Sequence, residues 1–391
     1  MNHADNLIKA KSATQYIFLI CGIALSTWAI MVPFVKERLH LNDARLGMLM
    51  LLLGVGAMLT MPITGIFIQR LGSRKTIFLF VLVISCALPL LSIMTSEYAL
   101  GINLLVFGGA LGGMDVAMNT HGANVQNAYE RPIMSSLHGW FSVGGLLGAL
   151  SLGFFIKTGF SPIAAVFGIS ILLMTVVFKQ YGHLLTEENE NQIKASFNEA
   201  HSIKVKGSFQ WLNKRVFFLG VMCFMVFMSE GAILDWGSIL LNEYQGVDKE
   251  WAGLGFATFS VAMAIMRLMG DRLVARYHPE KVVIYGSSLA AIGFLTTLTP
   301  YLSLSLCGFA LIGIGVANLV PIFFSEGGRL INVPAAIAMP AITSFGYAGQ
   351  LMGPALLGYI AAWMTLTVAF GGIALLLSVV AIAYFLKRLY K

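Results

Sequence analysis

Residues 101–126 read GINLLVFGGALGGMDVAMNTHGANVQ, and they decide how the rest of the chain is interpreted. The stretch is long enough to cross a bilayer as one helix, because a spanning helix needs about 20 residues. Its second half is nevertheless polar, with Asp115 near the centre of the run. A carboxylate at bilayer depth costs a few kcal/mol or more unless it faces protein, water or a partner. The stretch therefore predicts a transmembrane helix that turns Asp115 away from lipid.

Composition extends this interpretation to the whole chain. Of its 391 residues, 58% are hydrophobic and only 11% are charged, and the mean hydropathy is +0.81. A soluble protein carries about 25% charged residues. Apolar runs of about 20 residues recur along the chain, as in a polytopic helical membrane protein. The formal net charge of +7 lies mainly in short loops and forms no basic stripe with interleaved aromatics, so a nucleic-acid partner is not expected.

Twelve transmembrane helices in two six-helix bundles are predicted. The first six spans are 14–35, 44–69, 76–95, 100–126, 134–156 and 160–181, and the others are 215–241, 251–274, 281–299, 301–325, 335–361 and 364–386. We expect an N-terminal bundle (1–181), a polar cytoplasmic linker (182–214) and a C-terminal bundle (215–391). Lys and Arg are concentrated in the loops on the side of both termini, which places the termini in the cytoplasm. The N-terminus shows no signal-peptide cleavage site. We expect a monomer in the bacterial inner membrane, with the lipid bilayer as its surroundings.

The two halves resemble each other weakly. A shift of 200 positions superimposes six residues of the fourth span on identical residues of the tenth, namely Gly108, Ala110, Leu111, Gly113, Val116 and Ala117 on Gly308, Ala310, Leu311, Gly313, Val316 and Ala317. Parallel six-helix repeats are typical of transporters that bind a solute between their halves and work by alternating access.

The segment between the second and third spans carries a family resemblance. It reads GIFIQRLGSRK from Gly65 to Lys75, and the matching segment of the second half reads RLMGDRLVARYHPEK from Arg267 to Lys281. Both resemble the loop signature of the major facilitator superfamily, although Gln69 replaces the usual acid in the first. The resemblance implies twelve helices in two pseudo-symmetric bundles and loop residues that act as gates: Arg70, Arg74, Lys75, Asp271, Arg272 and Arg276.

A narrower resemblance is to the fucose permease branch, which imports sugars and related solutes with protons. It depends on the acid of the fourth span and on HGWFSVGGLLGA from His138 to Ala149. Relatives of that branch also use an acid in the first span, and this chain has none between Thr14 and Val35.

Two acids are the main candidates for proton coupling. Asp115 and Glu230 lie at matching depth, one in each half, as judged from a helix rise of about 1.5 Å per residue. Carboxyl groups in a partly dry cavity can take up and release protons, although a buried acid can also be paired for structure alone. His121 and His138 could relay protons, or could brace the hairpin of the fourth and fifth spans.

Solute contacts are expected from aromatic and amide side chains at similar depth. Asn119 lies one helical turn from Asp115, and the other candidates are Trp28, Trp236, Asn318 and Gln350. No spacing indicates a metal site, and no cofactor is expected.

The leading hypothesis is a secondary active transporter that carries a small polar organic solute, with sugars as one candidate class, by proton-coupled symport. A proton-driven exporter of drugs or metabolites is the alternative within the same fold. A membrane-embedded enzyme is the alternative of another class, but HExxH, GxSxG and P-loop motifs are absent from the sequence. An enzyme is therefore not expected.

Overall fold

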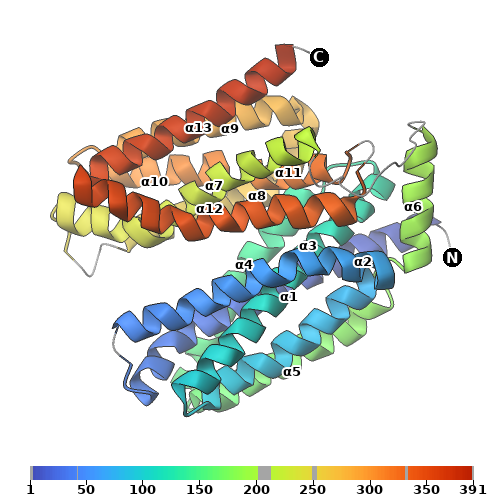
Figure 1. Ribbon diagram of the computed structural model, residues 1–391, viewed down its shortest axis with the longest axis horizontal. Coiled ribbons are helices and arrows are strands. Elements are labelled where there is room, and N and C mark those ends of the chain that lie inside the picture. The colour runs from blue at the N-terminus through green and yellow to red at the C-terminus, as the bar shows by residue number, and fades with distance from the viewer. Residues whose placement is uncertain (1–2, 42, 201–212, 249–252, 331–332, 390–391) are drawn as a thin grey trace. The chain divides into compact units, whose positions relative to one another are not determined.

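The computed structural model describes residues 3–41, 43–200, 213–248, 253–330 and 333–389, and all regular elements within these ranges are helices (Figure 1). The N-terminal elements are α1 (His3–Arg38), α2 (Asp43–Ile93), α3 (Glu97–Tyr129), α4 (Met134–Lys157), α5 (Pro162–Tyr181) and α6 (Glu187–Ala200). The C-terminal elements are α7 (Lys214–Ile239), the π-helix η2 (Leu240–Tyr244), α8 (Leu254–Tyr277), α9 (Pro279–Thr297), α10 (Leu302–Val316), α11 (Leu319–Gly327), α12 (Ala335–Trp363) and α13 (Leu366–Leu389).

The helices have the length and composition that membrane crossing requires. Within the described ranges, nine helical segments are long and apolar enough to span a bilayer. With the second arm of α2, and with α9 and α12, the helices match the twelve predicted spans. The predicted fold class is confirmed.

The second and third spans are joined differently from the prediction. The sequence predicts a loop between residues 69 and 76, but α2 continues through this region with one non-helical residue, Gly72, at φ 75° and ψ 163°. This region of the backbone map is open mainly to glycine. A Cβ at Gly72 would also lie 3.2 Å from the Cβ of Glu187 in α6. Figure 1 shows the two arms of α2 meeting beside α6. Gly72 therefore supplies both the turn and the close approach of the linker helix.

The chain divides into two compact units, each of which mixes the two sequence halves slightly. Unit 1 comprises residues 1–130, 140–211 and 328–341, and unit 2 comprises residues 131–139, 212–327 and 342–391. In unit 1, Arg329 Nε donates to Asn127 Oδ1 at 3.0 Å. In unit 2, the Ser136 N–H donates to the Asp271 carboxylate at 3.2 Å. Ser136 at the start of α4 is therefore bonded to a C-terminal helix, and Arg329 of the C-terminal half is bonded to an N-terminal one.

Glycines allow the helices within each unit to pack at backbone distance. In unit 1, a Cβ on Gly108 of α3 would lie 2.0 Å from the carbonyl oxygen of Leu53 in α2. In unit 2, Gly293 of α9 and Gly308 of α10 face each other, and a Cβ on either would lie 2.8 Å from the other's carbonyl oxygen. Small residues at such crossings drive helix association in membranes, where lipid is as apolar as the side chains.

The tenth predicted span is broken. The sequence predicts one helix over 301–325, but α10 ends at Val316 and α11 begins at Leu319, with a turn at residues 317–318. Pro321 explains the break, because it has no N–H to donate to the carbonyl of Ala317 four residues earlier. The break frees a backbone acceptor inside an apolar span.

Candidate functional site

The acid of unit 1 is Asp115, which lies in the middle of α3 and is partly buried. Asn119, one turn later, is fully buried and donates through Nδ2 to the Asp115 carboxylate at 3.1 Å and to its backbone carbonyl at 2.8 Å. The amide thus holds the carboxylate in a fixed position on the helix. The structure brings these two predicted site residues together.

Trp28 occupies α1 of the same unit and is 2% exposed. Its indole N–H is buried and has no hydrogen-bond partner within the part of the chain that the structure describes. A buried indole N–H usually finds an acceptor, so Trp28 is an exception among the buried polar groups of unit 1. The neighbouring turns of α1 pack closely on α4, because a Cβ on Gly148 would lie 2.2 Å from the hydroxyl of Ser26. The glycine-rich run that opens the fifth span has this packing role.

The acid of unit 2 is Glu230 in α7, and it lies beside Arg267 of α8. Glu230 Oε1 and Arg267 Nη2 are 3.4 Å apart, with 18% and 10% of their side chains exposed. Arg267 Nε donates to the carbonyl of Ala317 at 3.2 Å, so it satisfies the acceptor that the Pro321 break leaves open. An arginine in the middle of a spanning helix costs about 2.5–3.5 kcal/mol. Two helices and a broken helix therefore supply the groups that make this charge tolerable.

Arg267 is a site residue that the sequence analysis does not identify. In the sequence-based interpretation, Arg267 is only the first residue of the second gate segment. It nevertheless follows the apolar run FATFSVAMAIM directly. A cation that interrupts a spanning helix is itself a functional signal, and this signal could have identified it.

The remaining predicted solute contacts of unit 2 have different surroundings. Asn318 is 2% exposed, and its Oδ1 lies where a Cβ on Gly270 would be, 1.8 Å away. Its side chain therefore fills the space beside the glycine of α8. Gln350 of α12 packs against Gly231, the residue after Glu230, with 3.3 Å between its carbonyl oxygen and the position of a Cβ there. Trp236 packs near Gly358, and its buried indole N–H also has no partner among the described residues.

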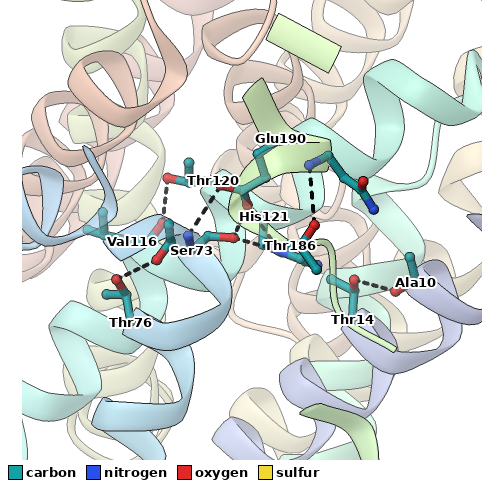
Figure 2. Close-up of polar contacts among 11 residues, drawn as sticks. Ala10, Thr14, Ser73, Thr76, Val116, Thr120, His121, Thr186 and Glu190 are labelled. Carbon is teal, nitrogen blue, oxygen red and sulfur yellow. Dashed lines mark hydrogen bonds and ion pairs between the residues drawn. The ribbon is translucent and has the colours of Figure 1, made fainter. Parts of the chain in front are cut away.

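His121 lies in a buried polar cluster with Ser73 and Glu190 (Figure 2). His121 Nδ1 is 2.6 Å from Ser73 Oγ and 3.4 Å from Glu190 Oε1. The Ser73 hydroxyl donates to Glu190 Oε1, and the Ser73 N–H lies 3.3 Å from Oε2. All three residues are 0% exposed. We name this the linker cluster, because Glu190 comes from α6 of the linker and the other two come from α2 and α3.

The sequence predicts a polar linker, and the structure gives the described part of it a packed role. Thr186 caps the start of α6, where its Oγ1 accepts from the Asn189 N–H at 3.3 Å. The cap fixes the first turn of α6 and directs Glu190 into unit 1. Residues 201–212 of the predicted linker lie outside the described residues.

His138 belongs to unit 2, whereas His121 belongs to unit 1. The His138 ring is 8% exposed, packs against Phe324 with 5.7 Å between the ring centroids, and interacts electrostatically with Arg267. The two histidines of the predicted relay therefore occupy separate clusters.

The predicted gate residues differ in their exposure and in the contacts that they make. Arg74 stacks its guanidinium on the Tyr181 ring at 3.9 Å, whereas Arg70 and Lys75 are exposed. In the second segment, Asp271 accepts from the N–H of Ser136 in the first turn of α4, where a helix favours negative charge. Arg272 is exposed, and Arg276 lies over the Tyr277 ring at 5.4 Å.

Apolar spanning helices, close glycine crossings and intramembrane charges in both units define the class of the molecule as a polytopic helical membrane protein. The chain matches the model of the Major Facilitator Superfamily over residues 16–336, and it belongs to that family. It is 40% identical over 375 residues to a protein of Yersinia pestis described as an uncharacterized MFS-type transporter, with 96% of this chain and 94% of the relative covered. The family and its relatives are transporters rather than enzymes.

Solved structures share the fold. The proton:xylose symporter XylE superimposes with a TM-score of 0.76 at 12% identity, covering 97% of this chain and 95% of that one. FucP in the outward conformation superimposes with a TM-score of 0.74 at 15% identity, covering 98% and 99%. As a member of the Major Facilitator Superfamily, the protein is a multi-pass membrane transporter of small-molecule solutes.

Proposed function

We propose that the protein is a secondary active transporter that moves a small polar organic solute together with protons by alternating access. The observation that carries the proposal is an acid within the spanning helices of each unit. Asp115 is held by Asn119, and Glu230 lies beside Arg267. Ionisable groups are kept inside membrane helices mainly at substrate and proton pathways.

The roles follow from the surroundings of the two acids. Asp115 keeps part of its surface accessible and its amide neighbour can remain bonded to either protonation state, so it suits a group that binds and releases a proton. The unpartnered indole N–H groups of Trp28 and Trp236 suit acceptors on a solute, such as hydroxyl or carboxylate oxygens.

We further propose a monomer in the bacterial inner membrane with both termini in the cytoplasm. The support for the orientation is the excess of Lys and Arg in the loops on the side of the termini. On this orientation the linker cluster is buried at the cytoplasmic end of unit 1.

The test begins with a thermal-shift screen of the purified protein against sugars, sugar acids, amino acids and nucleosides. The solute that stabilises the protein is then offered to proteoliposomes under pH gradients of either sign. Symport predicts accumulation only when the receiving compartment is alkaline, and export by antiport predicts the opposite dependence.

The Asp115→Asn variant should lose gradient-driven accumulation but keep solute exchange. Asp248→Asn, which removes an exposed acid outside the spans, should behave as wild type. Wild-type accumulation ratios in Asp115→Asn would contradict the coupling role of this acid.

A further inference from the structure

Arg267 puts a positive charge inside the spanning helices, and the binding of a neutral solute does not require such a charge. It lies in the middle of α8, thirteen residues after Leu254 and ten before Tyr277, and it is 8% exposed. Hydroxyl groups of a neutral solute are bound well by amides and indoles, which unit 2 already offers. A buried guanidinium, in contrast, is the side chain best shaped to receive a carboxylate through two parallel hydrogen bonds.

The contacts of Arg267 differ in kind. Its Nε bond to the Ala317 carbonyl is a neutral backbone contact that Pro321 makes possible, and it fixes the plane of the guanidinium. Its contact with Glu230 joins Nη2 to Oε1 at 3.4 Å, which is longer than the 2.7–2.9 Å usual for a bond between such charges. The first contact positions the group, and the second balances its charge loosely.

We infer that Arg267 recognises a carboxylate on the transported solute, and that this carboxylate replaces Glu230 as the counterion when Glu230 takes up a proton. This inference depends on the proposed function and names its substrate class as a small organic anion. The exchange is balanced. The pair Arg267⁺·Glu230⁻ with one solute carboxylate and one proton gives Arg267⁺·carboxylate⁻ and neutral Glu230. One proton therefore accompanies one anion, and the exchange adds no net charge to unit 2.

Protonation of Glu230 is required for a physical reason. Two carboxylates that share one guanidinium repel each other, and in a dry site one of them must be neutral. Glu230 interacts with Arg267, and Arg267 interacts with Glu230 and with the His138 ring from the start of α4. His138 is thus a rival proton acceptor, and the experiment has to separate it from Glu230.

The experiment measures ligand binding to the purified full-length protein without any gradient. The probes are three matched pairs at constant ionic strength: sodium acetate with acetamide, sodium benzoate with benzamide, and sodium D-glucuronate with D-glucose. We expect at least one carboxylate to raise the thermal stability at pH 6 in a saturable way, and its neutral counterpart to have no effect. The apparent affinity should then fall about tenfold per pH unit across the range where Glu230 ionises, because one proton binds with each anion.

Variants assign the proton and the anion to their groups. Glu230→Gln mimics the neutral acid, so it should bind the carboxylate equally at pH 6 and pH 8, and at pH 8 at least tenfold more tightly than wild type. Arg267→Met should abolish binding. Arg267→Lys, which keeps the charge without the planar fork, should bind more weakly, and it serves as the second variant if the methionine protein does not fold. Asp235→Asn, an exposed acid on the same helix, should keep the pH dependence of wild type.

Proton uptake provides a direct count. In weakly buffered solution with a pH-sensitive dye, wild type should take up one proton per bound carboxylate and Glu230→Gln should take up none. The inference is overturned if no carboxylate binds, if neutral analogues bind as well as the acids, or if the pH dependence persists in Glu230→Gln and so belongs to another group such as His138.

The inference and the proposed function can fail separately. Gradient-driven accumulation of a neutral solute, without carboxylate binding, would overturn the anion site and leave proton-coupled transport standing. Carboxylate binding with uptake of one proton, but without accumulation under any gradient, would support the anion site and overturn proton-coupled transport.

Discussion

Removing the carboxylate of Glu190 should release α6 from unit 1. This carboxylate is fully buried and accepts from the N–H and the hydroxyl of Ser73, and His121 Nδ1 lies 3.4 Å away. A hydrogen bond to a charged group contributes about 1.5–3 kcal/mol net. If Glu190→Ala removes the free energy contributed by one such hydrogen bond, the population of molecules with α6 undocked should rise about 10- to 150-fold. This conversion uses a factor of ten for about each 1.4 kcal/mol.

Hydrogen exchange of the α6 amides measures this population, because amides in a locally opening segment exchange in proportion to the open fraction. The matched control is Glu188→Ala, which removes an exposed acid from the same helix with the same change of charge. Exchange in α6 should accelerate in Glu190→Ala and stay near wild type in the control. Equal exchange in the two variants would show that α6 is held by other contacts, and the reasoning from the linker cluster would then be refuted.

Three further predictions concern glycines that the packing requires. Gly270→Ala should lower the free energy of unfolding by about 1–3 kcal/mol, because the new Cβ would lie 1.8 Å from Asn318 Oδ1, whereas Gly371→Ala, with no atom within 4 Å, should be neutral in thermal unfolding. Adding Asn318→Ala to Gly270→Ala should recover part of this loss, and a double-mutant cycle that gives strict additivity would contradict the contact. Gly72→Ala should cost about 1 kcal/mol or more because the residue has φ 75°, and unchanged thermal unfolding would count against the observed turn.

Composition and periodicity are sufficient for the fold class. Lipid offers the backbone no hydrogen-bond partners, so long apolar runs can only become spanning helices. Asp115 and Glu230 are also evident from the sequence, because a charged side chain inside a spanning helix is costly whichever helices pack beside it. The loop signatures that begin at Gly65 and Arg267 indicate the family from the residues alone.

The breaks in the helices are less visible in the sequence. Proline and glycine, such as Pro321 and Gly72, occur in many membrane helices without breaking them, because neighbouring groups can satisfy the freed backbone. Whether such a residue breaks its helix depends on the groups that pack around it in the tertiary structure. At Ala317 the freed carbonyl is satisfied by Arg267, and at Gly72 the turn is filled by Glu187.

The sequence by itself determined that this chain is a twelve-helix membrane protein with at least one acid inside the spans of each half, because hydropathy and charge cost are local properties that each span carries alone. Only the tertiary structure decided which partners those charges have. Glu230 meets Arg267 across 37 positions, and Glu190 meets Ser73 across 117. Such pairs depend on which faces of which helices pack together, and a helical period does not encode the side chain that stands opposite on another helix.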